Sequence, residues 1–243
     1  MTDIDALAAQ RLAADEARIT GSRRTNVTLG EAWRRFWTAP SPWLIGGSLA
    51  ISVVGRLLSG SGSAYELLIP VALIAAFPLI EWSIHVAILH WKPRRVGPVE
   101  IDSLLARKHR AHHADPRDLP LVFIPTRALL WLLPTYAVVA WLAMPTTTAT
   151  WSLLVSVYGI KFGYEWVHYL VHSDYRPASR WFRHVWRNHR LHHYKNEHYW
   201  FGVTTAGTAD RLLKTYPEPG SVQTSDTVKD LHALEASRES TTP

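Results

Sequence analysis

Four long apolar stretches constrain this sequence more than any other feature, because a helix needs about 20 residues to cross the hydrocarbon core of a bilayer. They run from Trp43 to Leu58, from Leu67 to about His90, from Ala128 to Met144 and from Trp151 to about His172. The stretches contain three prolines, Pro70, Pro78 and Pro134. Proline breaks the helices of soluble proteins but is tolerated in membrane bundles. The sequence therefore predicts an all-α fold, a bundle of four transmembrane helices.

The basic residues are distributed unequally between the two ends of these stretches. The connections 59–65 and 145–150 contain no Lys or Arg, whereas the opposite side is rich in both. The positive-inside rule places the basic side in the cytoplasm, and four crossings then put both termini there. We expect a multi-pass protein of a bacterial cell membrane. A soluble helical core, the alternative, does not account for this asymmetry, and the same sidedness argues against a nucleic-acid partner. Arg56, near the outer end of the first stretch, is expected to snorkel or to pair with Glu66.

The polar ends of the chain flank this membrane region. Residues 2–21 are polar and Ala-rich and predict a loose helix, and Thr28 and Glu31 fit a capping box. The helix that the box starts combines Trp33, Phe36 and Trp37 with two arginines and should end before Pro40. We interpret it as a helix on the membrane surface, with an ordinary amphipathic helix as the alternative.

The predicted organisation has three parts. Residues 1–40 form a cytoplasmic polar segment with the interfacial helix, and residues 41–215 form the membrane-bound domain. Residues 216–243 are polar, with Pro, Ser, Thr and mixed charge, and predict a disordered tail.

Histidine is the residue type that carries chemistry here, because the chain has no cysteine and a metal ion would need His, Asp or Glu. Ten of the 13 histidines form four clusters: His85 and His90; His109, His112 and His113; His168 and His172; and His189, His192 and His193. Residues three and four apart share a helix face, whereas adjacent residues diverge by about 100°. Each HxxHH motif can therefore serve two ions. His85 and His90 are five apart, diverge further, and are expected to straddle the ions.

The predicted topology brings these clusters together. The histidine pairs lie at the cytoplasmic ends of the second and fourth stretches, and both HxxHH motifs fall in cytoplasmic segments. Ten imidazoles exceed the needs of one ion, and neutral imidazole suits zinc, copper, iron and nickel. We expect two metal ions, iron in the active protein, with zinc as a replacement in purified protein. Of the remaining histidines, His198 is expected to be an accessory residue and His232 to be solvated in the tail.

Two carboxylates lie inside the apolar stretches, where ionisable groups are rare and usually functional. Glu81 precedes His85 by four residues, and Glu165 precedes His168 by three. We expect each carboxylate to accept the distal ring N–H of a metal-binding histidine, which orients the ring. A helix pair between Glu165 and Lys161 is the alternative.

These motifs resemble those of the fatty acid hydroxylase and sterol desaturase superfamily, and of its fatty acid 2-hydroxylase branch. The likeness covers about residues 81–215 and is carried by HVAILH at 85–90, KHRAHHADPRDLPLVFIP at 108–125, HYLVHS at 168–173 and NHRLHHYKNEHYWFGVTT at 188–205. The resemblance implies four spans, a cytoplasmic histidine-rich cap, two iron ions and O2-dependent hydroxylation of a fatty acyl chain beside its carboxyl group.

The resemblance also bears on partners and on rival functions. Some relatives carry a fused haem electron carrier; this chain has no room for one, so we expect a separate electron-donor protein. Arg94, Arg187 or Lys195 is a candidate for an anionic lipid head group, unless these residues are only solvated topology charges. Carotenoid or sterol hydroxylases and desaturases have overlapping motifs. A non-catalytic membrane metal-binding protein is the alternative from another class.

The charge asymmetry leads to a prediction about topology. Reporter fusions after Arg127 and after Pro243 should both report the cytoplasm, and a fusion after Gly60 should report the outside. A fusion after Arg127 that reports the outside would overturn the four-span arrangement.

Overall fold

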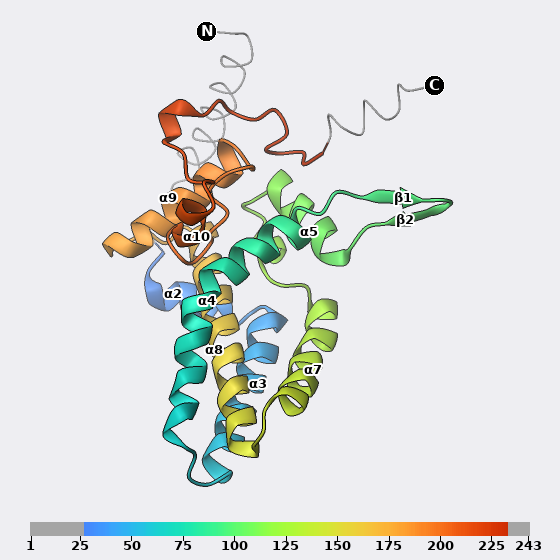
Figure 1. The fold of residues 1–243 in the computed structure, drawn as a ribbon. Coiled ribbons are helices and arrows are strands. Elements are labelled where there is room, and N and C mark those ends of the chain that lie inside the picture. Colours follow the sequence, from blue (N-terminus) through green and yellow to red (C-terminus); the bar gives the residue numbers. More distant parts are fainter. Residues whose placement is uncertain (1–26, 233–243) are drawn as a thin grey trace.

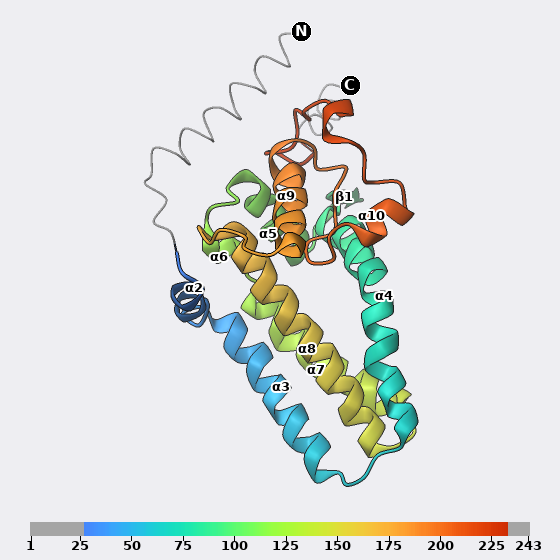
Figure 2. The same ribbon diagram turned by 90° about the vertical axis from the view of Figure 1, so that its left-hand side faces the viewer.

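The computed structural model describes residues 27–232, so the polar segment predicted at residues 2–21 lies outside the described residues. Long helices form a bundle, and shorter helices and loops form a cap at one end of it (Figures 1 and 2). The long helices are α3 (Pro40–Leu58), α4 (Leu68–Ile84), α7 (Thr126–Ala143) and α8 (Thr147–His172). The chain is mostly helical, as predicted.

The cap consists of shorter elements. Its helices are α5 (Leu104–Ala114), α6 (Leu119–Val122), α9 (Arg180–Tyr194) and α10 (Thr208–Leu212). Three further turns of helix are η1 (Ala64–Leu67), η2 (His85–Leu89) and η3 (Pro219–Ser221), of which η1 lies at the opposite end of the bundle. The α2 helix (Leu29–Phe36) lies where the bundle meets the cap (Figure 2).

Three helical stretches in the described part of the chain are long and apolar enough to cross a membrane. They are α3 (Pro40–Leu58), the continuous run of η1, α4 and η2 (Ala64–Leu89), and the run that contains α6 and α7 (Leu119–Ala143). Their outer surfaces expose large apolar side chains, among them Leu57 (75% exposed) and Leu142 (82%). Contiguous apolar surface of this kind is unfavourable in water and suits a hydrocarbon environment. The chain is therefore a membrane protein.

The fourth long helix, α8, differs from the other three in composition. It is 26 residues long and contacts α3, α4 and α7. It also contains Lys161, Glu165 and two histidines, and it is not among the three candidate spans. That α8 also crosses the membrane remains a prediction.

The end of the bundle away from the cap is held together by polar side chains. Arg56 of α3 lies 3.4 Å from the carboxylate of Glu66, which confirms the predicted pair. Glu66, which is buried, also accepts hydrogen bonds from the hydroxyls of Thr148 (2.6 Å) and Ser152 (3.0 Å) on α8. One carboxylate thus connects α3, η1 and α8.

The capping box at the start of α2 is confirmed. The Thr28 amide donates to the Glu31 carboxylate (2.8 Å), and the Glu31 amide donates to the Thr28 hydroxyl (3.2 Å). The helix ends at Phe36, as its predicted stop before Pro40 requires. Phe36 is fully buried and contacts the rings of Phe123, Phe162 and Tyr169, which anchors α2 to the junction between α8 and the cap.

Two parts of the cap differ from the sequence-based prediction. Strands β1 (Arg94–Val96) and β2 (Val99–Ile101) form a small antiparallel hairpin that projects from the cap, and Gly97 (φ +61°) supplies the left-handed turn (Figure 1).

The described residues 216–232 also depart from the disordered tail expected from their composition. They lie against the cap, and Val228 and Leu231 are buried there. Two apolar residues and a set of specific hydrogen bonds order a segment that is polar on average; residues 233–243 lie outside the description.

The contact between α3 and α8 generates a stability prediction. A Cβ at Gly55 would lie 2.5 Å from the Trp151 ring, whereas a Cβ at Gly47 would meet nothing within 4 Å. Gly55→Ala should lower the melting temperature in detergent, because overpacking costs about 1–3 kcal/mol. The matched change Gly47→Ala on the same helix should leave it equal or raise it, since alanine gains about 0.5–1 kcal/mol over glycine in a helix. Equal melting temperatures for the two variants would contradict this packing.

Candidate metal centre

All ten clustered histidines meet where the cap covers the ends of α4 and α8. Nine of them fall into two groups whose ring nitrogens lie within 4.8 Å of one another. The first histidine group contains His85, His90, His109, His113 and His192. The second histidine group contains His112, His168, His172 and His189. All are buried or half-buried.

The tenth histidine, His193, lies between the groups. Its Nε2 is 3.0 Å from Nε2 of His189 in the second group, and its ring centroid is 4.2 Å from that of His113 in the first. We assign it to the second group on the nitrogen distance, which makes five imidazoles in each.

The two HxxHH helices supply the groups in a crossed pattern. Helix α5 contributes the first and last histidines of its motif, His109 and His113, to the first group and the middle one, His112, to the second. Helix α9 does the reverse, with His192 in the first group and His189 in the second. The divergence of about 100° between adjacent helical residues produces this division, as the motif predicts.

His85 and His90 do not straddle the two groups, which corrects the prediction. Both belong to the first group, with ring centroids 5.0 Å apart. The reason is a π-helical turn at His85–Leu89, in which the His90 amide donates to the His85 carbonyl (3.0 Å). The wider turn brings residues five apart toward one face, and such π-turns often occur at functional sites.

Within each group the Nε2 atoms face each other. In the first group, the His109 Nε2 lies 3.1 Å from that of His85 and 3.2 Å from that of His113. In the second, the His172 Nε2 lies 3.1 Å from that of His112 and 2.8 Å from that of His189. Two nitrogens that each lie about 2.1 Å from one ion are separated by about 3.0–3.4 Å. The observed spacings suit histidines that share a cation.

Backbone carbonyls set the tautomers of three rings in the first group. Nδ1 of His85 donates to the Phe201 carbonyl (2.6 Å), that of His113 to Val228 (3.1 Å) and that of His192 to Tyr199 (2.8 Å). A carbonyl can only accept, so each neutral ring keeps its proton on Nδ1 and directs a bare Nε2 lone pair into the group. Several lone pairs facing one another repel unless a cation lies between them. The residues therefore fit a metal ion.

The second group shows the same need for a cation. Nε2 of His168 is buried and has no hydrogen-bond partner among the described residues. The carbonyls of Val122 and Pro116 hydrogen-bond the rings of His168 and His172. The unpartnered Nε2 is left as a free ligand atom.

Burial keeps the cap imidazoles neutral. Removal from water disfavours the imidazolium ion and lowers the pKa well below its usual value for His109, His112, His113, His189, His192 and His193. Neutral imidazole is the form that binds metal ions.

Glu81 and Glu165 do not contact the histidine rings, which corrects their predicted role. Glu81 accepts hydrogen bonds from the amide and hydroxyl of Thr204 (2.8 and 2.6 Å) and from the hydroxyl of Thr205 (2.7 Å). Glu165 accepts from the Ser41 hydroxyl and the Ile124 amide. The carboxylates instead bind the segments that follow Phe201 and Val122. The carbonyls of Phe201 and Val122 are hydrogen-bonded to the rings of His85 and His168. Lys161, the alternative partner of Glu165, lies over the Tyr136 ring.

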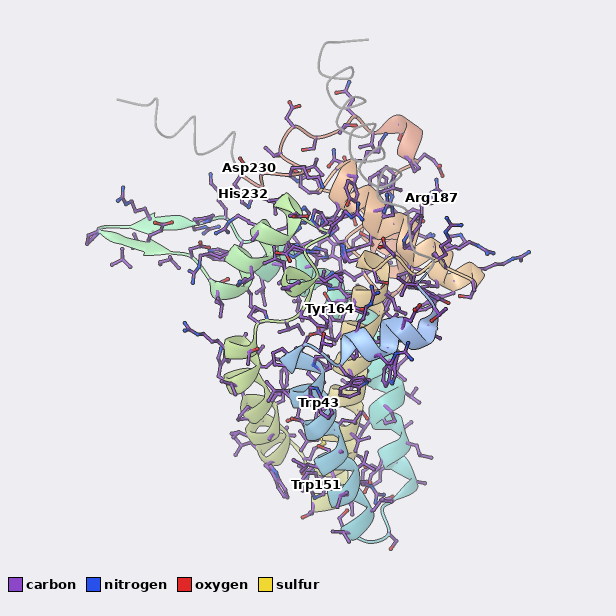
Figure 3. All side chains as sticks on the ribbon, turned by 180° about the vertical axis from the view of Figure 1, so that it is seen from behind. Trp43, Trp151, Tyr164, Arg187, Asp230 and His232 are labelled. Carbon is purple, nitrogen blue, oxygen red and sulfur yellow. The ribbon has the colours of Figure 1, made fainter. Side chains whose placement is uncertain are left out.

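The three histidines outside the clusters differ in environment. His184 is exposed on α9, and the His198 side chain is 70% exposed with Nε2 3.5 Å from Glu197. His232 is not a solvated tail residue: it is half-buried, and its Nε2 donates to the His90 carbonyl (3.2 Å), so the prediction for it is wrong (Figure 3).

The three candidate head-group residues do not form one site. Arg94 lies on the hairpin over the Trp91 ring, and Arg187 is exposed on α9, on the other side of the cap (Figure 3). Lys195 lies at the end of α9.

Two buried acids were missed in the sequence. Asp210 is fully buried and accepts hydrogen bonds from the Phe201 and Gly202 amides (2.8 Å each). Burial raises the pKa of its carboxyl group. Glu197 is 2% exposed and accepts from Ser225 and Thr227. Sequence position gave one indication of these acids. Glu197 lies inside the last histidine-rich motif, residues 188–205, and Asp210 lies five residues after it.

Two sequence comparisons with known proteins found matches. A profile of the family described as fatty acid hydroxylase matches residues 70–215. The chain is 29% identical over 191 residues to dihydroceramide fatty acyl 2-hydroxylase FAH2 of Arabidopsis thaliana, covering 75% of this chain and 73% of that protein.

A solved structure shares the fold. The hydroxylase domain visible in full-length scs7p aligns with a TM-score of 0.60 at 19% identity, covering 76% of this chain and 70% of that one.

The two groups generate a prediction about metal content. Purified protein should hold two transition-metal ions per chain, measured by elemental analysis. His109→Ala and His168→Ala should each lower the content toward one ion, because each removes a ligand from one group only. His184→Ala, an equal change on the exposed side of α9, should retain both ions. A reproducible content of zero or one ion in active unmodified protein would rule out two sites.

Proposed function

This chain belongs to the fatty acid hydroxylase family, and we propose that it hydroxylates the acyl chain of a lipid at the carbon beside the carboxyl group, using O2 and external electrons. The observation that carries the proposal is the convergence of ten imidazoles into two neighbouring groups at the end of an apolar helix bundle. Soluble, purely structural metal sites need only four ligands and no contact with a membrane.

Iron suits the proposed site best. Two iron ions, when bound, would supply O2 activation and the cleavage of an unactivated C–H bond. The first histidine group and the second, with His193, would hold them. Imidazole is a ligand for both iron and zinc, and zinc can replace iron in purified protein.

The chain's own part in the reaction is orientation and exclusion of water. The carbonyls of Phe201, Tyr199 and Val228 fix the rings of three ligands, so that their Nε2 atoms need no rearrangement when metal binds. The rings are buried, which keeps bulk water away from the reacting centre.

A fatty acyl chain is the substrate class that the position of the site favours. His85 directly follows α4, and His172 ends α8, so both groups lie where the long helices meet the cap. Acyl chains dissolved in the bilayer would reach this level along the helices. The Arabidopsis relative is named for 2-hydroxylation of a fatty acyl group, which supports the carbon beside the carboxyl.

We place the cap in the cytoplasm, with α3, α4, α7 and α8 as four crossings. The proposal follows from the position of the Arg- and Lys-rich segments on the cap side. Residues 41–215 then form the membrane-bound hydroxylase domain. A separate electron-donor protein would approach the cap from the cytoplasm.

The proposed activity is tested with ¹⁸O2. Cells that express the intact protein should incorporate label into a 2-hydroxyacyl lipid, detected by mass spectrometry against a deletion strain. His112→Ala, His113→Ala, His192→Ala and His193→Ala should each abolish labelling while the protein stays in the membrane, because each removes a proposed ligand. His184→Ala should retain it.

The other outcomes separate the related activities. Label in a carotenoid or a sterol would keep the site and overturn the substrate. A lipid that loses two hydrogens without gaining label would indicate desaturation. Metal binding with no change in any lipid and no O2 consumption would leave a non-catalytic metal-binding protein.

A further inference from the structure

Glu197 is a buried acid that the metal chemistry leaves unused. It lies three residues after the last turn of α9, between the histidines of that helix and Tyr199. Its side chain is 2% exposed, although glutamate is almost never buried without partners. Its Oε1 accepts hydrogen bonds from the hydroxyls of Ser225 (2.9 Å) and Thr227 (2.5 Å).

Both hydroxyls belong to one segment, residues 222–232, which we call the C-terminal strap. The strap makes two more bonds to the residues beside Glu197: the Ser225 amide donates to the Lys195 carbonyl (2.8 Å), and the Asn196 side chain donates to the Gln223 carbonyl (3.2 Å). The Glu197 carboxylate is therefore the centre of a small network that joins the strap to the loop after α9.

Each side of this network ends on a proposed metal ligand. On the strap, Val228 directly follows Thr227, and its carbonyl accepts the Nδ1 proton of His113 (3.1 Å). On the loop, Tyr199 follows Glu197 by two residues, and its carbonyl accepts the Nδ1 proton of His192 (2.8 Å). His113 and His192 both belong to the first histidine group.

We infer that Glu197 is a positioning residue for the first metal site, which fastens the strap to the loop and so fixes the rings of His113 and His192. The inference rests on the proposed two-metal function. Without the carboxylate, the strap hydroxyls lose this acceptor, and the Val228 carbonyl is held less firmly at the His113 ring. That ring can then carry its proton on Nε2, where it cannot bind a metal ion.

The effect should be confined to one site. In the second group, His168 and His172 are hydrogen-bonded by the carbonyls of Val122 and Pro116, which lie in the segment before α7. Neither residue belongs to the strap or to the loop after α9. Loss of Glu197 should therefore weaken one of two metal sites, whereas general destabilisation would weaken both.

The test is a titration of metal-free, detergent-purified full-length protein with Co²⁺, followed by its visible absorption bands. Unmodified protein should bind two ions. Glu197→Leu should bind one with unchanged affinity and the other about 10–100-fold more weakly, as for other groups that orient ligand histidines. Glu197→Gln keeps an oxygen acceptor of the same length and should restore the second site. The exposed strap-side acid Glu218 provides the matched control, and Glu218→Leu should bind as unmodified protein does.

A second variant covers the case in which Glu197→Leu does not fold. Ser225→Ala combined with Thr227→Val removes the same two hydrogen bonds from the strap side and should give the same selective weakening. Two unchanged sites in the folded variants, or equal weakening of both, would overturn the inference. If unmodified protein binds two Co²⁺ ions but never hydroxylates a lipid, the proposed function is wrong and this inference is unaffected.

Discussion

The cap depends on one chemical constraint: a buried neutral imidazole has two nitrogens, and only one of them can face a metal ion. The other carries a proton and needs an acceptor, because an unpaired buried donor costs about 1–3 kcal/mol. In the first histidine group, three of these acceptors are carbonyls outside helices α5 and α9. They lie in irregular segments, at Phe201, Tyr199 and Val228, whereas the buried Nδ1 atoms of His112, His189 and His193 have no hydrogen-bond partner among the described residues. The loops of the cap are thus part of the site.

These loops need supports of their own, and buried acids provide them. Glu81 holds Thr204 and Thr205, Asp210 holds the Phe201 amide, and Glu197 holds the strap. A carboxylate that bonds a ring directly orients one ligand. A carboxylate that bonds several amides and hydroxyls orients the whole loop, and with it the carbonyl that faces the ring. The acids therefore act one step further from the histidines than their sequence spacing suggests.

The sequence predicted what depends on periodicity. Helical spacing placed His112 and His113 in different groups, and apolar length placed the long helices. The sequence-based prediction failed where contacts between distant segments determine the structure. The π-turn that turns His90 toward His85 has no local sequence signal, and the partners of Glu81 lie more than a hundred residues away. The strap is polar on average, so composition predicted disorder, yet burial of Val228 and Leu231 and the Glu197 network hold it.

The composition of α8 follows from its place in the bundle. Between Thr148 and His172 only Gly163 is exposed, because α3, α4 and α7 surround the helix. A helix that contacts protein on most sides has no need of an apolar surface. Its polar groups can bond to neighbouring helices: the Tyr158 hydroxyl donates to the Leu133 carbonyl of α7 (2.7 Å). Helix α4 shows the opposite case, with apolar residues exposed along most of its length. Low hydropathy is therefore weak evidence against a crossing by α8. At 1.5 Å per residue its 26 residues extend about 39 Å, enough to span a bilayer core of about 30 Å.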